Sequence, residues 1–361
     1  MTYLDRARGA LETIRAQGRY REVQTEGPKC AADFSSNDYL GLARDSRMIE
    51  AMRHVKAVGS GGARLLGGRH REHALLEQDV ARWLGRERAL LFSSGYLAAL
   101  GAISVLAPLV DGIYSDELNH ASLIDGIRAA KTERHVYPHG AIPAPGARRG
   151  SALIVSESLF GMDGDVVEAA QLVDALGGDD VLLIDEAHAI GVLGQAGAGT
   201  ARGIQDDRIV VLGTLGKAVG AAGGFVAGPA TIIELLVNAA RTFIFDTAMP
   251  PAIAFAARVG VMLAKSADER RERLGANVER LHRGLHVMGF PVPARAVPIV
   301  PVIAGSEQNA MELMRRCSER GIYAPAVRPP TVPPGSSRLR VSVRADHTAE
   351  QIDLLLGALS G

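Results

Sequence analysis

The sequence predicts an α/β fold, in which a domain built around a mainly parallel sheet is followed by a smaller α+β unit. Short apolar runs alternate with amphipathic helical segments between residues 88 and 228. Several of these runs contain consecutive Val, Ile and Leu residues, as in strands that are buried on both faces of a parallel sheet between helices. After about residue 240 this alternation ends, and a different order of helices and strands marks the second unit.

Strands are expected where the apolar runs fall, at 88–94, 112–116, 151–158, 181–188, 208–217 and 223–228. Apolar residues at helical spacing predict helices between them, at 95–106, 121–130 and 166–176. Ahead of the first strand we expect an amphipathic helix and an exposed turn within 1–30, and helices at 46–56 and 73–85. Five glycines make 58–68 a loop, and Gly85 would end the preceding helix as its C-cap.

The second unit is predicted to open with a long helix over 251–288. A strand at 297–304, a helix at 307–320, a strand at 338–344 and a helix at 348–359 follow, with a proline-rich loop at 328–335. We therefore divide the chain into an N-terminal helical segment (1–40), a large domain (41–265) and a C-terminal domain (266–361).

Charge and composition exclude several classes of protein. Lys plus Arg and Asp plus Glu both number 40, so no bulk charge attracts nucleic acid or an anionic membrane. The longest apolar stretch, 98–110, is too short and interrupted to span a bilayer, and no signal peptide is visible. Two distant cysteines, Cys30 and Cys317, fit a reducing compartment. We expect a cytoplasmic protein without nucleic-acid or membrane partners.

Polar residues follow several of the predicted strands, at the carboxyl ends where α/β sheets bind ligands. Gly95 and Tyr96 open a helix after a strand, which suits a phosphate but is equally an ordinary tight turn. His120 follows the next strand and could be structural. Asp185 ends an apolar strand three residues before His188, and a buried acid needs a cationic partner. A metal ion is possible there, but further ligands are missing at any familiar spacing, and a cationic ring nitrogen would serve equally.

Lys217 lies in a glycine-rich turn after another strand, and only five of the 40 basic residues Lys and Arg are lysines. A Schiff base explains a lysine there, because arginine cannot form one. A nucleotide-binding module is the alternative, but Ala218 breaks the P-loop pattern and no GxGxxG follows the first strand. A phosphate cup with His120, Asp185 and Lys217 corresponds to the parts of a pyridoxal 5′-phosphate (PLP) site, and no metal is expected.

The chain resembles the α-oxoamine synthases, which are fold type I PLP-dependent acyltransferases with a seven-stranded, mainly parallel sheet. The resemblance rests on FSSNDYLGL, GSGGARLLGG, ALLFSSGY, NHASLIDG, LFGMDGD, IDEAHAIGVLG, TLGKAVG, TAMPPA and RPPTVPPGSSRLRVSV, in this order along the chain. The GSGG and RPPTVP segments favour the branch that condenses L-alanine with a pimeloyl thioester to 8-amino-7-oxononanoate in biotin biosynthesis. The acyl carrier would be coenzyme A or an acyl carrier protein.

The resemblance also implies roles for individual residues. Lys217 would hold the cofactor covalently and move the substrate's α-proton, and Asp185 would pair with the pyridine nitrogen. His188 would bond the phenolic oxygen, and His120 would stack on the ring. The phosphate would be bound by Gly95, Tyr96 and Thr214, and by Thr247 across a homodimer interface. Arg340, Thr331, Asn37 and an N-terminal arginine, Arg19 or Arg21, would bind substrate.

Gly161 departs from the family, whose members often have serine before MDGD. We expect water, Ser156 or Ser158 to replace that hydroxyl, with altered cofactor binding rather than loss of activity. Two alternatives remain open. One is a sibling enzyme that uses the same cofactor residues, such as glycine C-acetyltransferase, 5-aminolevulinate synthase or a serine palmitoyltransferase. The other is a catalytically silent partner subunit, which the presence of Lys217 and Asp185 disfavours.

Overall fold

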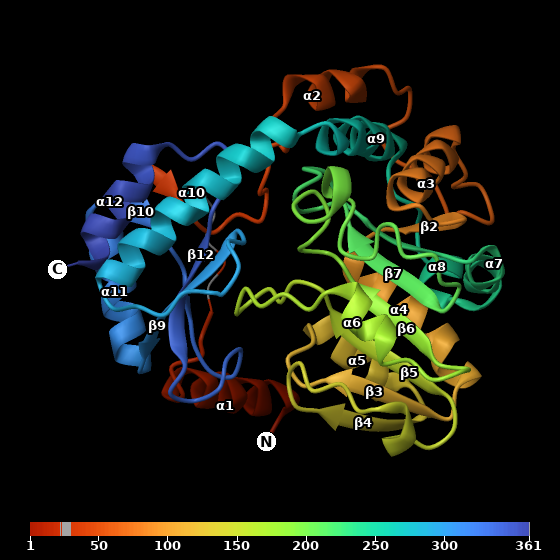
Figure 1. The fold of residues 1–361 in the computed structure, drawn as a ribbon, viewed down its shortest axis with the longest axis horizontal. Coiled ribbons are helices and arrows are strands. Elements are labelled where there is room, and N and C mark those ends of the chain that lie inside the picture. Colours follow the sequence, from red (N-terminus) through yellow and green to blue (C-terminus); the bar gives the residue numbers. More distant parts are fainter. Residues whose placement is uncertain (22, 24–29, 361) are drawn as a thin grey trace.

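A computed structural model describes residues 1–21, 23 and 30–360, and its large unit is organised around one seven-stranded sheet (Figure 1). The strand order is β2-β8-β7-β6-β5-β3-β4. The strands are β2 (Arg88–Phe92), β3 (Gly112–Asp116), β4 (Glu133–Tyr137), β5 (Ala152–Glu157), β6 (Val181–Asp185), β7 (Ile209–Thr214) and β8 (Gly224–Gly228). β8 runs antiparallel to β2 and β7, and the remaining pairs are parallel. The predicted mainly parallel sheet is confirmed.

The central strands are buried on both faces, as their continuous apolar sequence indicates. Alternate residues of β6 point to opposite sides of the sheet, with Leu182 and Ile184 in one core cluster and Leu183 in the other. The cluster around Leu183 is covered by α4 (Gly95–Leu106), α5 (Ala121–Ala129), α7 (Ala230–Ala239) and α8 (Arg241–Ile244). The other is covered by α2 (Ser46–Arg53), α3 (Arg71–Leu84), α6 (Ala169–Asp174) and α9 (Pro251–Lys265).

The C-terminal unit is a three-stranded antiparallel sheet with helices against it (Figure 1). It contains α10 (Asp268–Val287), β9 (Ile299–Gly305), α11 (Glu307–Glu319), β10 (Ile322–Tyr323), β11 (Ala326–Val327), β12 (Ser337–Ser342) and α12 (Ala349–Leu359). β1 (Ala32–Asp33) pairs in parallel with β10, so the chain after residue 30 joins this unit. It then continues along it, because Ser342 N donates to Phe34 O at 2.7 Å. The first helix, α1 (Tyr3–Ala16), has no buried residue.

Several details differ from the sequence-based expectations, among them the short strands β1, β10 and β11, which were not predicted. The helix expected over 251–288 is two helices, α9 and α10. The hydroxyl of Ser266 turns back to the carbonyl of Met262 at 3.1 Å, and Asp268 starts a new helix with its acid in the first turn. Strand β4 was not predicted, because its charged side chains mark an edge strand rather than a buried one. Helices α7 and α8 were also missed.

Short 3-10 turns lie at Ala107–Leu109, Pro145–Ala147 and Gln195–Gly197. The turn expected at the end of 1–30 falls partly on residues 22 and 24–29, which lie outside the described residues. None of the helices in the described ranges combines the length and apolar character needed to cross a membrane.

Candidate active site

The carboxyl ends of β5, β6 and β7 surround a cavity of about 160 Å³. This volume exceeds what one or two buried water molecules need, and it suits a small ring with a phosphate. The cavity is lined by Gly95, Tyr96, His120, Ser122, Glu157, Asp185, Ala187, His188, Leu212, Gly213, Thr214 and Lys217. The structure therefore brings together every residue that the sequence assigned to the cofactor, except Thr247.

Asp185 and Glu186 leave β6 in opposite directions. Asp185 is 6% exposed, lines the cavity, and accepts a hydrogen bond from Ala187 N at 2.8 Å. Burial raises the pKa of Asp185, and the nearby Lys217 opposes this. Glu186 instead accepts bonds from Ser158 Oγ at 2.8 Å and from Thr200 Oγ1 at 2.9 Å. Glu186 therefore does not serve as a second carboxylate ligand beside Asp185. In the part of the chain that is described, no cluster of three candidate metal ligands occurs.

Lys217 reaches the cavity from the glycine-rich turn after β7. Backbone bonds fix this turn, with Leu215 N donating to Gly223 O at 2.9 Å and Gly220 N donating to Lys217 O at 2.8 Å. Burial lowers the pKa of the Lys217 amine to about 8, although Asp185 and Glu157 act in the opposite direction. A neutral amine, the form that attacks a carbonyl carbon, is thus accessible near neutral pH.

His120 and Glu157 form a pair that links two strand ends. His120 is the N-cap of α5, and its Nδ1 lies 2.8 Å from Ser122 Oγ. Its backbone N–H donates to Glu157 Oε1 at 2.6 Å, so a carboxyl group at the end of β5 holds the start of α5. Burial, reinforced by Asp185, raises the pKa of Glu157 to about 8. Glu157 was not predicted as a site residue, yet it ends an apolar strand as Asp185 does, and that signal could have identified it.

The hydroxyl of a tyrosine contacts the His188 ring at Nδ1. Its Nδ1 lies 2.6 Å from the hydroxyl of Tyr39, which is fully buried. Burial, together with the charge of Lys217, lowers the pKa of His188 well below its ordinary value, so the imidazole is neutral. Tyr39 was part of the FSSNDYLGL motif but was not singled out, because nothing local in the sequence links it to residue 188.

The N-terminus of α4 forms the end of the cavity that suits a phosphate. Ser94 caps this helix, accepting from Leu97 N at 3.2 Å with its hydroxyl, while the residues that follow it, Gly95 and Tyr96, line the cavity. Thr214 faces them from the end of β7, and a Cβ on Gly95 would lie 3.4 Å from its Cβ. Backbone N–H groups at the positive end of a helix are a favourable anion site. Together with Asp185 and Lys217, the residues present fit PLP.

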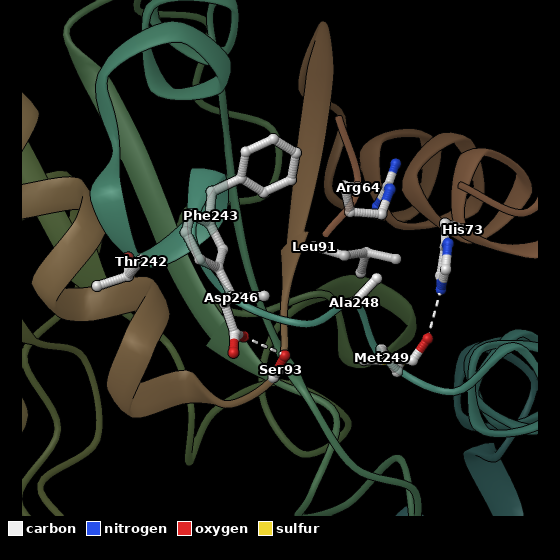
Figure 2. A pocket seen from close by; sticks show the side chains of 10 residues that line it. Arg64, His73, Leu91, Ser93, Thr242, Phe243, Asp246, Ala248 and Met249 are labelled. Atoms are coloured by element: carbon white, nitrogen blue, oxygen red, sulfur yellow. Dashed lines mark hydrogen bonds between the residues drawn. The ribbon is translucent and has the colours of Figure 1, made fainter. Parts of the chain in front are cut away.

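Thr247 is placed differently from the other predicted phosphate ligands. It is exposed and does not line the cavity of its own chain. Its carbonyl accepts from Ser93 Oγ at 3.1 Å, and the same hydroxyl bonds Asp246 (Figure 2). An antiparallel bridge between Thr247 and Ala63 ties this segment to the glycine-rich loop. Figure 2 shows the small pocket beside it, where His73 bonds the carbonyl of Met249 at 2.7 Å.

Arg340 lies in β12 and is 7% exposed. Its guanidinium donates to Gly161 O at 2.5 Å, to Ser342 Oγ at 2.8 Å and to Asn37 Oδ1 at 3.1 Å. Among the described residues no carboxylate pairs with it, which is unusual for a buried cation and fits a site for an anionic ligand. The structure thus brings together two of the predicted substrate residues, Arg340 and Asn37.

The other predicted substrate residues lie in a second cavity, of about 610 Å³. It is lined by Leu11, Ile14, Gly18, Arg19, Tyr20, Arg21, Ala326, Val327, Arg328, Pro329, Pro330 and Thr331. Arg19 and Arg21 both line it, on the side opposite the loop that carries Thr331. We call this space the arginine cavity, and neither Arg340 nor Asn37 is among its lining residues.

Neither of the two serines expected to replace the hydroxyl at Gly161 reaches the cavity. Ser156 Oγ donates to Glu157 O at 3.1 Å and Ser158 Oγ donates to Glu186 Oε2 at 2.8 Å, and neither side chain lines the cavity. Ser156 lies within β5 and Ser158 directly follows this strand, and their hydroxyls are used by the hydrogen bonds just named. Gly161 instead approaches the imidazole, because a Cβ there would lie 2.4 Å from His188 Nε2.

Comparison with known proteins decides the family. The family model of class I and II aminotransferases matches residues 31–359. The 8-amino-7-oxononanoate synthase of Methylococcus capsulatus is 43% identical, over 97% of this chain and 96% of that protein. The enzyme of that name from Anaeromyxobacter dehalogenans is 42% identical, over 99% and 95%. The chain belongs to the 8-amino-7-oxononanoate synthase family.

Solved structures agree on fold and cofactor. The serine palmitoyltransferase of Sphingomonas wittichii superposes with a TM-score of 0.86 at 29% identity, covering 99% of this chain and 96% of that one. A serine palmitoyltransferase solved with PLP gives 0.85 at 29% identity, over 99% and 96%. The 8-amino-7-oxononanoate synthase of Francisella tularensis gives 0.78 at 27%, over 91% and 96%. The chain is therefore a fold type I, PLP-dependent acyltransferase.

Proposed function

We propose that this chain condenses L-alanine with a pimeloyl thioester and releases 8-amino-7-oxononanoate, carbon dioxide and the free thiol carrier. The bond from the alanine Cα to the acyl carbon forms, the thioester bond breaks, and the carboxyl group leaves as carbon dioxide. One observation carries the proposal: Lys217, Asp185 and His188 converge on one cavity. Arg340, which pairs with no carboxylate of the described residues, donates to the carbonyl of Gly161, and Gly161 lies beside the His188 ring. The names of the relatives at 42–43% identity support the choice of substrates.

Each cavity residue has a chemical task in this reaction. When bound, PLP supplies a cationic ring that withdraws electrons from the bonds broken at the amino acid's Cα. Asp185 would hold the proton on the ring nitrogen, since its buried carboxylate needs a cationic partner. His188 would donate to the phenolic oxygen, and His120 would cover one face of the ring. Gly95, Tyr96 and Thr214 would hold the phosphate.

Lys217 would attach the cofactor covalently and then act as a base. Once the substrate amine has displaced it, its Nζ is free to take the proton from Cα and later to return it. A pKa of about 8 allows both steps near neutral pH, because the amine can be neutral when it accepts and protonated when it donates. Arg340 would bind the alanine carboxylate, and Asn37 would hold the guanidinium in place.

The spectrum of the protein with PLP tests this proposal. We expect a visible absorption band on adding PLP, and a change in that band on titration with L-alanine at lower concentration than with glycine or L-serine. A preference for serine would indicate the sibling activity of the palmitoyltransferases, which share this fold. The absence of any band would mean that Lys217 does not carry the cofactor.

We also infer a cytoplasmic homodimer in which Thr247 reaches the phosphate of the partner subunit's site. The exposure of Thr247 supports this, as does the absence of any arginine from the lining of the cofactor cavity in the described residues. The thiol carrier would be coenzyme A or an acyl carrier protein. Light scattering gives the mass in solution, and activity with each thioester identifies the carrier.

A further inference from the structure

We infer that Tyr39 is a positioning residue, which holds the His188 imidazole with its proton on Nε2, ready to donate to the phenolic oxygen of the cofactor. This inference rests on the role proposed above for His188. Tyr39 does not line the cavity, so it would act on the cofactor through His188. Its contacts place it between the cofactor cavity and the buried Arg340.

The chain after β1 fixes Tyr39. Its backbone carbonyl accepts from Ala345 N at 2.8 Å, in the C-terminal unit, while its side chain reaches into the large unit. The hydroxyl oxygen lies 2.6 Å from His188 Nδ1 and 3.2 Å from Asn37 Oδ1. One side chain therefore joins residues that are about 150 positions apart in sequence, and it does so without contact with solvent.

The hydroxyl has one proton to donate and two acceptors within reach. Asn37 Oδ1 already accepts from Arg340 Nη2 at 3.1 Å, and the contact to His188 Nδ1 is the shorter of the two. Burial raises the pKa of Tyr39 to about 12, so the hydroxyl keeps its proton. We therefore assign the proton to the bond with Nδ1. Since the imidazole is neutral, its own proton then lies on Nε2.

The opposite edge of the ring is enclosed by Gly161. A Cβ there would lie 2.4 Å from Nε2, so the absence of a side chain at Gly161 allows the backbone to approach this edge of the ring closely. The carbonyl of Gly161 is itself fixed by Arg340 Nε at 2.5 Å. Among the described residues no protein atom bonds Nε2, and His188 lines the cavity. The N–H that Tyr39 sets is thus left for the cofactor.

Tyr39→Phe removes one oxygen and keeps the buried ring. We expect the variant to bind PLP and show a visible band, but the pH midpoint of that band should rise by about one unit, as expected for the loss of a hydrogen bond to a charged group. The direction follows because the phenolic oxygen, no longer bonded by an oriented N–H, holds the cofactor's own proton more tightly. Tyr137→Phe is the matched control: Tyr137 is equally buried and its hydroxyl donates to Val155 O at 3.3 Å, outside the cavity.

Nitrogen NMR of the cofactor-free protein gives an independent test. With labelled histidine, and with His188→Asn to assign the signals, we expect a protonated Nε2 and an Nδ1 that accepts a hydrogen bond. A protonated Nδ1, or a Tyr39→Phe midpoint equal to that of the wild type, would overturn the inference. If the wild type shows no visible band, the proposed function fails, while the NMR result still decides the Tyr39–His188 contact. A structural role alone would lower the thermal stability of Tyr39→Phe and leave the midpoint where it was.

Discussion

The cofactor cavity and the arginine cavity differ in the elements that enclose them and in the exposure of their walls to solvent. The first is enclosed by the ends of buried strands, and its acids Asp185 and Glu157 are 6% and 4% exposed. The second lies between the end of α1, a helix with no buried residue, and the loop 326–331. The first places a few ionisable groups at fixed positions in a dry space, where charges interact strongly. The second offers arginines on walls that solvent reaches.

We propose that the two cavities serve different parts of the reaction. Bond breaking at Cα needs groups held to a fraction of an ångström, which packed strand ends provide. An acyl chain with its carrier needs only an open, apolar and cationic passage, and the space between the end of α1 and the proline-rich loop would suit it. Substitutions in the cofactor cavity should therefore change the chemical step, and those in the arginine cavity should change only the binding of the thioester.

The largest effect is expected at Lys217. Lys217→Ala removes both the covalent attachment and the base, so turnover should fall about a thousandfold or more while the fold is retained. Steady-state assays and the visible band measure the two losses separately. Lys265→Ala is the control, since Lys265 is exposed at the end of α9. Full turnover in Lys217→Ala would refute the proposed role of the cofactor cavity.

Arg340 is buried like the residues of the cofactor cavity, and we propose that it binds the substrate. Arg340→Lys keeps the charge and loses the fork that bonds Gly161, Ser342 and Asn37, so KM for L-alanine should rise about 10- to 100-fold. Retention of PLP should not change. The control is Arg338→Lys in the same strand, where Arg338 pairs with Asp163 instead. An unaltered KM for alanine in Arg340→Lys would place the carboxylate elsewhere.

Glu157 makes the stability of the cofactor-free protein depend on pH. The pKa of Glu157 is about 8 in the folded chain against an ordinary value of 4.5, so the folded state binds more protons between these pH values. The stability that this group contributes is therefore complete below pH 4.5 and is lost as pH rises through 8. Glu157→Gln, which cannot titrate, should make the fall of Tm between pH 5 and 8 shallower. Glu133→Gln, at an exposed position on β4, should follow the wild type.

The sequence predicted the cofactor cavity well because its signals are local. Asp185 after an apolar strand and Lys217 in a glycine turn are informative without any knowledge of the fold, since each is a charge where the neighbouring sequence is buried. Strand order then brings them together. Tyr39 carries no such signal, because its contact with His188 depends on how the N-terminal segment crosses between two units.

The rest of the substrate site could be predicted only through the resemblance. Arg340 lies in a strand whose charged and apolar residues alternate, and nothing local separates it from Arg338. Arg19 and Arg21 are both in a polar segment, and the structure places both on the arginine cavity. Likewise the break at Ser266 follows from one side-chain bond to the backbone, which hydrophobic periodicity does not detect.

The smallest effects are expected in the arginine cavity itself. Arg19→Ala and Arg21→Ala should each raise KM for the acyl thioester about two- to fivefold, because exposed charge pairs contribute about 1 kcal/mol or less. KM for L-alanine and the visible band should stay at their wild-type values. Arg8→Ala is the control, since Arg8 pairs with Asp5 on α1 and does not line the cavity. If either substitution raised KM for the acyl thioester as much as Arg340→Lys raises KM for alanine, the arginine cavity would hold its ligand as closely as the cofactor cavity does. The proposal that the two cavities serve different parts of the reaction would then be wrong.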